Sequence, residues 1–480
     1  MSHIDLIAVA TDQCAMHVMV AVQRKGSLLP LLALLVLVTA EDGPNNVNSD
    51  AYLDTPGLIE KYGYPVERHQ VVSQSGYILT LFRIPQGKNC SAPGEPVLMH
   101  HGFLADSDTW LLQEDQSLPY VLVDSNECYD VWLANGRGNR YSRNHTTLDP
   151  GKSEYWQFSW HEQGAHDIPA IIDYILSVAG KSALMYLGHS MGTTIYFVMA
   201  CERPEYQQKV QLAVLLAPVC YMSNIPSPII RFISPSANPL AHLLGPLLHW
   251  EIPPSQPPTP ESVETQDNST VAQVLGILGA VLGTTNIKEV NISRYEAQHS
   301  RGISGGSVRQ AVHYAQEVVS GHFRQYDFGL LRNIKKYGST SPPDYNLRNI
   351  FSPVIAMYGN GDWLVGEKDV KRLANDTMSN VRFYRVPEDG FAHSDFLIGK
   401  NAPTLVYPLV LAAFAGEDIG ASKDVDVDTD STSRTSMRLS APTQRSRPEG
   451  RKKKKTQTAK KTVPKVGSSL RPRSGRHQRL

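Results

Sequence analysis

A serine, an acid and a histidine in this chain have the residue types and the order of a nucleophilic relay. Ser190 is the centre of Gly188-His189-Ser190-Met191-Gly192, a Gly-x-Ser-x-Gly pentapeptide, and Asp362 and His393 follow it. A serine hydroxyl becomes a good nucleophile when a histidine accepts its proton and a carboxylate orients that histidine. The order serine, acid, histidine is the one that this pentapeptide requires. We therefore predict Ser190 as the nucleophile, His393 as the general base and Asp362 as its orienting acid.

Two backbone N–H groups are predicted to stabilise the oxyanion that forms when such a serine attacks a carbonyl group. One belongs to Met191, directly after the nucleophile, and the other to Phe103, in the loop after an apolar strand-like run. Taken alone, His101-Gly102 is also typical of a plain turn at the end of a strand.

Each member of the relay has an ordinary alternative when it is taken singly. The pentapeptide also fits a structural glycine-serine turn, Asp362 fits a turn residue, and His393 fits a surface histidine. Two rival acids lie nearby: Asp369 begins a helix-like stretch, where a carboxylate has a capping role, and Asp395 is close enough to fix the histidine loop. Asp362 ranks first because it directly follows a strand in the required order.

The sequence around the relay alternates between strand-like and helix-like patterns. An apolar run enters the pentapeptide at 183–187, and a helix-like run leaves it at 193–200. Further strand-like runs lie at 76–85, 96–104, 129–135, 211–219, 352–358 and 381–386, and a helix-like run lies at 167–176. This alternation predicts an α/β fold with a mostly parallel central sheet that is covered by helices.

The sequence pattern changes from about 221 to 309, and this change predicts a helical cap, or lid, inserted over the carboxyl edge of the sheet. Its apolar segments are 229–233, 240–250 and 274–282, and a Pro/Ser-rich acidic stretch separates them. A cap of this kind excludes water and provides an apolar surface for an apolar substrate. The alternative is that these helices simply pack on the main core.

The N-terminal residues 1–40 are predicted to be an extension followed by a secretory signal peptide. Arg24-Lys25 precede the short apolar stretch 27–40, which ends in small residues and is followed by polar ones. A signal anchor or a buried helix is the alternative for this stretch. After cleavage at such a signal we expect no transmembrane segment.

The net charge of zero hides an acidic body and a basic tail. Residues 434–480 carry 16 basic side chains and one acidic side chain, while the remainder carries 30 basic and 45 acidic side chains. Residues 417–480 have too little apolar surface to fold alone, so we predict a disordered, acidic-then-basic tail after a catalytic domain at 41–416. A nucleic-acid role depends on this tail alone, and behind a signal peptide we expect no nucleic-acid partner.

Four cysteines follow the signal stretch, namely Cys90, Cys128, Cys201 and Cys220. They are too few and too widely spaced for a disulfide scaffold or a zinc site, although one or two bridges of unassigned pairing fit an oxidising compartment. Sequons for N-glycosylation begin at Asn89, Asn144, Asn268, Asn291 and Asn375. The predicted chemistry needs neither a metal nor a cofactor.

Several further stretches carry a family resemblance that is far more specific than the pentapeptide. They are Tyr62–Glu67, His101–Ser107, Asn135–Arg143, Phe158–Glu162, Gly361–Leu364 and His393–Phe396. With them the chain resembles, from about 58 to 414, the gastric and lysosomal acid lipases, a family with many insect members. The resemblance implies an α/β-hydrolase fold with a helical cap, hydrolysis of acylglycerols or sterol esters without a cofactor, and the same three catalytic residues. Met191 is similar to the insect-type members.

Some positions depart from the family pattern. The cap cysteines of the vertebrate members are missing, so their disulfide is not implied here. Leu364-Val365-Gly366-Glu367 and Ile303-Ser304-Gly305-Gly306-Ser307 stand where the family usually has Leu-Ala-Asp-Pro and Pro-Ala-Gly-Thr-Ser. These differences bear on the range of substrates more than on catalysis.

The sequence therefore favours a secreted or lysosomal serine lipase. We expect it to hydrolyse triacylglycerol or sterol ester at a lipid–water interface through an acyl-enzyme. A carboxylesterase acting on short-chain soluble esters is one alternative, and a catalytically inactive lipid-binding relative is another.

Overall fold

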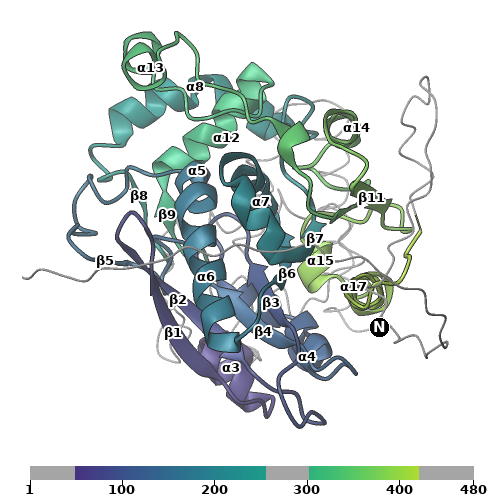
Figure 1. Cartoon of the computed structure of the whole chain (residues 1–480). Helices are drawn as coiled ribbons and strands as arrows, with labels where there is room; N and C mark the ends of the chain where they lie inside the picture. Colours follow the sequence, from purple (N-terminus) through teal and green to yellow (C-terminus); the bar gives the residue numbers. More distant parts are fainter. Residues whose placement is uncertain (1–48, 256–301, 421–480) are drawn as a thin grey trace, which may run out of the picture. The chain divides into compact units, whose positions relative to one another are not determined.

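The structure is a computed structural model that describes residues 49–255 and 302–420. A nine-stranded sheet lies at its centre (Figure 1). The strand order is β1-β2-β4-β3-β6-β7-β10-β11, and β5 pairs with β2. The strands are β1 (Glu67–Val72), β2 (Tyr77–Ile84), β3 (Pro96–His100), β4 (Asp130–Ala134), β5 (Asn144–His145), β6 (Leu184–His189), β7 (Val210–Leu216), β10 (Val354–Tyr358) and β11 (Val381–Arg385). From β4 to β11 along this order every pair is parallel, which confirms the predicted fold class.

Helices connect and cover these strands. They are α3 (Thr55–Lys61), α4 (Leu118–Val123), α5 (Trp160–Glu162), α6 (Ile168–Ala179), α7 (Met191–Glu202), α8 (Pro228–Leu244), α12 (Val308–Ser320), α13 (Leu330–Tyr337), α14 (Glu367–Asp376), α15 (Asp395–Ile398), α16 (Ala402–Leu405) and α17 (Tyr407–Phe414). In α6, Ile168, Ile171, Ile172 and Ile175 recur at helical spacing and are fully buried. That apolar stripe packs α6 against β1, β3 and α7.

The parallel strands bring the predicted site residues to one edge of the sheet. Every residue of β3, β4, β6 and β10 is buried, because a parallel strand with helices on both faces is apolar throughout. The loops after β3, β6, β10 and β11 all leave from the carboxyl edge, where open α/β sheets bind their ligands. These loops carry Phe103, Ser190, Asp362 and His393 respectively.

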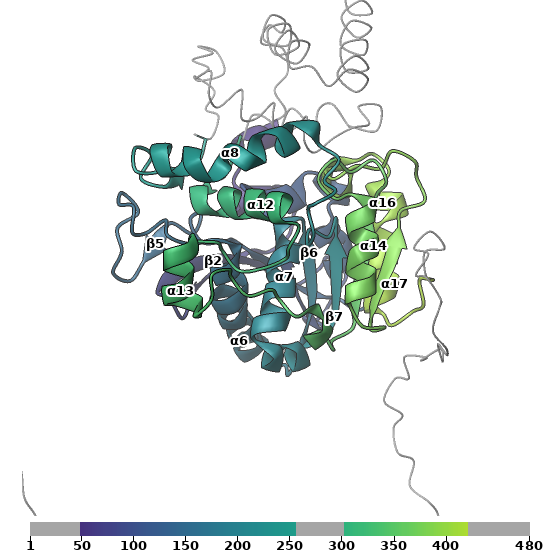
Figure 2. The same ribbon diagram turned by 90° about the horizontal axis from the view of Figure 1, so that it is seen from above.

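The long connection between β7 and β10, which we call the cap, contains the region that the sequence predicts as a lid. Within it, α8 packs on α12, and the short strands β8 (Glu251–Ile252) and β9 (Gly306–Ser307) form an antiparallel pair. Figure 2 shows α8, α12 and α13 as a layer seen from above the sheet. In the same connection, α12 and α13 follow the residue near 309 at which the sequence places the end of the cap. The apolar segment 274–282 lies outside the described residues.

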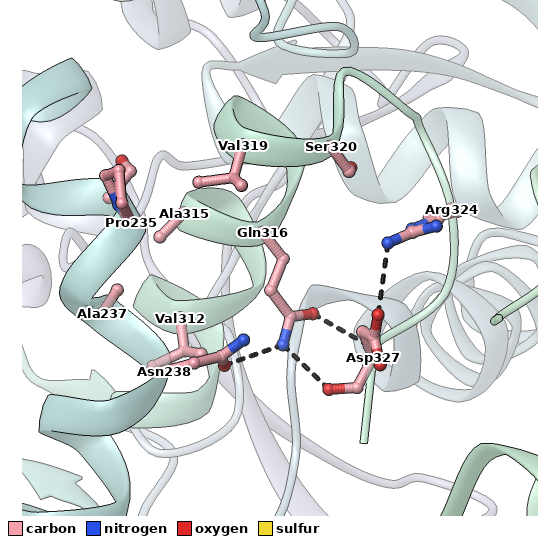
Figure 3. Close-up of a pocket in the computed structure, with 11 residues that line it drawn as sticks. Pro235, Ala237, Asn238, Val312, Ala315, Gln316, Val319, Ser320, Arg324 and Asp327 are labelled. Atoms are coloured by element: carbon pink, nitrogen blue, oxygen red, sulfur yellow. Dashed lines mark hydrogen bonds and ion pairs between the residues drawn. The ribbon is translucent and has the colours of Figure 1, made fainter. Parts of the chain in front are cut away.

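Gln316 joins the two long cap helices across a pocket (Figure 3). Its side-chain Nε2 donates to the side chain of Asn238 on α8 and to the backbone carbonyl of Asp327, at 2.9 Å each. Its Oε1 accepts the backbone N–H of Asp327 at 2.8 Å. Because all these groups are paired, the amide fixes α8, α12 and the following loop relative to one another.

The structure pairs two of the cysteines whose pairing the sequence left unassigned. Cys90 and Cys128 form a disulfide with their Cα atoms 5.8 Å apart, whereas Cys201 and Cys220 are free and buried. Among the described residues, no helix combines the length and the apolar character needed to cross a membrane.

Candidate active site

Ser190 lies at a sharp turn between β6 and α7, with backbone angles of φ 54° and ψ −117°. This strained conformation is uncommon for a residue with a side chain and is typical of functional sites. The two flanking glycines make the turn sterically feasible. A Cβ on Gly188 would lie 2.8 Å from the backbone of Gly192, and a Cβ on Gly192 would lie 2.3 Å from the carbonyl oxygen of His100. The strand, the turn and the helix therefore pass closer together than side chains allow.

The loop after β3 lies directly beside the serine. A Cβ on Gly102 would be 3.1 Å from the Cβ of Ser190 and 3.5 Å from its Oγ. The preceding His101 fixes this loop, because its Nε2 accepts the N–H of Gly136 at 2.9 Å and its Nδ1 donates to the carbonyl of Gly102 at 2.7 Å. Burial lowers the pKa of His101 to about 4, so the ring stays neutral and keeps this hydrogen-bonding pattern near neutral pH.

Asp362 and His393 meet through a direct contact. Nδ1 of His393 lies 2.8 Å from Oδ2 of Asp362, and both side chains are buried. A carboxylate only accepts hydrogen bonds, so Nδ1 is the donor and Nε2 of the neutral ring is left as an acceptor. The other oxygen, Oδ1, accepts the backbone N–H groups of Leu364 and Val365 at 2.7 and 2.9 Å. The carboxylate is thus held in one orientation by three donors.

Close backbone packing positions the loops of the acid and the histidine. A Cβ on Gly359 would lie 2.0 Å from the carbonyl oxygen of Phe391, and a Cβ on Gly361 would lie 2.2 Å from that of Gly390. In addition, the N–H of Gly361 donates to the carbonyl of Phe391 at 2.9 Å. The glycines around Asp362 therefore let the two loops touch.

A second histidine connects the turn of Ser190 to the loop of His393. Nε2 of His189 donates to the backbone carbonyl of His393 at 3.0 Å, and the two ring centroids are 5.0 Å apart. Burial, and then the neighbouring His393, lower the pKa of His189 to about 3. His189 is thus a neutral donor beside Ser190. His189 was given no role from the sequence, although its place in the pentapeptide was a signal.

The two rival acids are used elsewhere. Asp369 accepts the N–H of Asn224 at 2.8 Å, its side-chain amide at 2.8 Å and the hydroxyl of Ser223 at 3.1 Å. Asp369 therefore anchors the loop before α8. It does not cap its own helix as expected, because the donors that bind its carboxylate belong to that loop. Asp395 accepts the N–H of Ala392 at 2.7 Å within the histidine loop.

The two predicted oxyanion donors lie beneath the cap. Met191 is the first residue of α7, so its N–H has no acceptor within the helix. Its sulfur accepts a hydrogen bond from Nε2 of Gln310 in α12 at 3.3 Å, and the ring of Phe103 packs edge-on against Tyr314 of the same helix at 6.0 Å. Gln310 was not identified from the sequence; it is also the third residue of α12 and closes the capping box whose N-cap is Ser307.

The remaining predicted site residues are at the surface or outside the described part of the chain. Asn89, Asn144 and Asn375 are exposed, as glycan attachment requires. Asn268 and Asn291 lie outside the described residues. Within 49–255 and 302–420, no group of three or more His, Cys, Asp or Glu side chains is placed to hold a metal ion.

A serine on a strained strand-to-helix turn, with an acid and a histidine on later loops of a mostly parallel sheet, defines the class of the protein as an α/β-hydrolase. The family models agree. Residues 95–239 match the model described as alpha/beta hydrolase fold, and residues 55–114 match the model described as partial alpha/beta-hydrolase lipase region.

Several curated proteins are similar over most of their length. Lipase 3 of Drosophila melanogaster is 39% identical over 361 residues, covering 74% of this chain and 90% of that protein. Lipase member K of Mus musculus is 33% identical over 371 residues, covering 75% and 90%. Human lysosomal acid lipase/cholesteryl ester hydrolase is 31% identical over 405 residues, covering 81% and 98%. The chain belongs to the acid lipase family, and it is a carboxylic ester hydrolase by fold and relationship.

Proposed function

We propose that this chain is a secreted or lysosomal lipase that hydrolyses neutral-lipid esters, triacylglycerol or sterol ester, with Ser190, Asp362 and His393 as its catalytic residues. The observation that carries the proposal is the 2.8 Å contact between His393 and Asp362. The loop of His393 is also joined to the turn of Ser190, because His189 donates a hydrogen bond to the backbone carbonyl of His393. This arrangement leaves Nε2 of His393 as the proton acceptor that a serine nucleophile needs.

The reaction follows from these positions. Oγ of Ser190 attacks the ester carbonyl carbon while its proton passes to His393, and the N–H groups of Phe103 and Met191 stabilise the negative oxygen. The intermediate then expels the alcohol, which takes the proton from His393, and leaves an acyl-enzyme. Water attacks the acyl-enzyme with His393 again accepting a proton, and the fatty acid leaves as Ser190 regains its hydrogen.

The surface of the cap supports a lipid substrate over a small soluble ester. Seven large apolar side chains are exposed on α8 and just after it: Phe232, Ile233, Leu240, Leu243, Leu244, Leu247 and Leu248. Several large apolar side chains exposed on one segment are typical of a membrane or lipid contact. A carboxylesterase that acts on dissolved esters has no use for it.

Two observations support the secretory route. The stretch 27–40 has the pattern of a signal peptide, and the Cys90–Cys128 disulfide is typical of an oxidising compartment. The relative named lysosomal acid lipase/cholesteryl ester hydrolase is consistent with a destination in the lysosome.

Replacing Ser190 with alanine tests the proposal. We expect Ser190→Ala to abolish both ester hydrolysis and labelling by a fluorophosphonate, while the exposed Ser341→Ala retains both. Rates on emulsified triacylglycerol, cholesteryl ester and a dissolved short-chain ester then define the substrate. A wild-type rate that does not rise when the ester forms an interface would favour the carboxylesterase, and stoichiometric lipid binding without turnover would favour the inactive relative.

A further inference from the structure

Helix α13 is an exposed, amphipathic segment on the cap that the catalytic chemistry does not use. Three apolar side chains on it face solvent, with exposed fractions of 58% for Leu330, 79% for Leu331 and 47% for Ile334. Moving apolar side chains out of water is favourable, so three of them exposed on a helix of eight residues favour contact of the helix with an apolar phase.

The same helix carries three cations, Arg332, Lys335 and Lys336, and no acidic residue. All three are exposed, and among the described residues none of them forms an ion pair with a carboxylate. The ammonium of Lys336 lies 4.5 Å from the ring centroid of Phe328, so the neighbour of this charge is an aromatic face and not a carboxylate. The positive charge of α13 is therefore not neutralised by its neighbours.

The sequence places these two kinds of side chain on adjacent arcs of the helix. At about 100° per residue, Leu330, Ile334 and Leu331 fill one arc, and Lys335, Arg332 and Lys336 follow on the next. An apolar face bordered by basic residues is the pattern of a helix that lies in the plane of a lipid surface, with its cations among the headgroups.

The remaining face of α13 fixes the helix to the body of the cap. Asn333 is its buried residue, and its side chain donates to Asp327 at 2.8 Å and to the carbonyl of Thr340 at 3.0 Å. The hydroxyl of Tyr337 donates to the carbonyl of Tyr326 at 2.9 Å. Asp327, the nearby acid, also accepts from Arg324, so its charge is engaged within the cap. The helix is thus held rigidly with its apolar and basic arcs outward.

We propose that α13 docks the protein on anionic lipid surfaces, with Leu330, Leu331 and Ile334 entering the lipid and Arg332, Lys335 and Lys336 contacting the negative headgroups. Charge complementarity distinguishes this contact from that of α8, whose exposed side chains are mostly apolar. In Figure 1 both helices lie on the cap side of the sheet, so a lipid surface contacted by α13 is on the side of the proposed active site. This inference rests on the proposed lipid-ester function and adds a preference for negatively charged surfaces.

Binding to vesicles of ether-linked phospholipid, which contain no ester to hydrolyse, tests the inference. The full chain is mixed with vesicles of phosphatidylcholine alone, or with about a third of phosphatidylglycerol, and the bound fraction is measured by sedimentation. Each basic residue near an anionic surface contributes about 1 kcal/mol, so the triple variant Arg332→Gln/Lys335→Gln/Lys336→Gln is expected to bind the anionic vesicles about 100-fold more weakly. Its binding to neutral vesicles is expected to stay the same.

A matched control removes two exposed lysines from α14, Lys368→Gln/Lys371→Gln, and is expected to bind anionic vesicles like the wild type. A second variant, Leu330→Ser/Leu331→Ser, is expected to bind both kinds of vesicle more weakly. The rate on a dissolved short-chain ester checks the fold and the catalytic site, and it is expected to be unchanged in every variant. Equal anionic binding by the wild type and the triple variant, or an equal loss in the α14 control, would overturn the inference even if the enzyme proves to be a lipase.

Discussion

Nδ1 of His393 donates a hydrogen bond to Oδ2 of Asp362 at 2.8 Å, across 31 residues of sequence. The same carboxylate accepts two backbone N–H groups, so it is oriented toward the histidine before any substrate arrives. A preoriented acid fixes the tautomer of its histidine and stabilises the imidazolium that forms during attack.

The first prediction concerns this acid. Asp362→Asn keeps the size of the side chain and removes its charge, and we expect kcat on a dissolved ester to fall by about 10⁴ because the histidine loses its correct tautomer and its electrostatic support. The control is Asp369→Asn, which changes a buried aspartate that bonds Ser223 and Asn224. It is expected to lower thermal stability and to keep kcat within a few-fold of the wild type. The opposite ranking of the two variants would assign the acid to Asp369.

The second prediction concerns the close approach behind the nucleophile. A Cβ on Gly192 would meet the carbonyl oxygen of His100 at 2.3 Å, and a backbone atom in a central strand moves only at a cost. We expect Gly192→Ala to lower the free energy of unfolding by about 1–3 kcal/mol and to lower kcat as well, because the turn holding Ser190 must shift. Gly151→Ala is the control, since its Cβ would meet only the side chain of Asp149. Wild-type urea unfolding and wild-type kcat in Gly192→Ala would contradict the described packing.

The third prediction concerns the response of stability to pH. His313 of α12 stacks on Trp160 with ring centroids 3.7 Å apart, and burial lowers its pKa to about 3. An unfolded histidine has a pKa of about 6.5, so the unfolded chain binds the proton first as the pH falls. The folded state therefore loses stability from about pH 6.5 downward and loses none through this group above that pH.

Urea unfolding at about pH 7.5 and about pH 5 measures this effect. At pH 5 the proton on the unfolded chain costs the folded state about 2 kcal/mol. His313→Gln is expected to be less stable than the wild type at pH 7.5, because it loses the stacking, and to lose about 2 kcal/mol less between the two pH values. The exposed His242→Gln serves as the control and is expected to follow the wild-type slope. An unchanged slope in His313→Gln would show that this ring is protonated in the folded protein.

The fourth prediction concerns the disulfide. The bridge between Cys90 and Cys128 closes a loop with a sequence separation of 38 residues, and a loop of that length restricts the unfolded chain by about 4 kcal/mol. Cys90→Ala/Cys128→Ala is expected to lose roughly that much stability in chemical unfolding. Cys201→Ser and Cys220→Ser change buried free thiols, so the number of cysteines alkylated in denaturant without reduction is expected to fall by one in each. If Cys201 were paired instead, Cys201→Ser would not lower this number.

The sequence predicted the central strands well and one of the two edge strands poorly. The strand-like runs over β3, β4, β6, β7 and β10 were recognised because these strands are almost wholly buried and apolar, and the run over the edge strand β11 was recognised as well. Strand β1 was missed because it lies at the edge of the sheet, where Val71 is its buried residue and polar side chains face water. An edge strand needs no apolar run, so its sequence does not distinguish it from a loop.

Contacts between distant residues were not predictable from local patterns. The bond from His189 to the carbonyl of His393 joins residues 204 positions apart, and the contact of Gln310 with Met191 joins residues 119 positions apart. In the sequence, Gln310 has the type and position of a capping residue. Its second partner, Met191, depends on where α12 packs. The pairing of Cys90 with Cys128 likewise depends on how the ends of their loops approach each other.

The sequence by itself determined which residue types stand in which order: a serine between two glycines, then an acid, then a histidine, each after a strand. These sequence patterns follow from burial and close packing, because a strand covered on both faces must be apolar and a tight turn must contain glycine. The tertiary structure decided which acid reaches His393, which cysteines pair and which cap residues contact Met191 and Phe103. Those outcomes depend on how the parallel strands align their carboxyl ends, and this alignment is a property of the whole packed sheet.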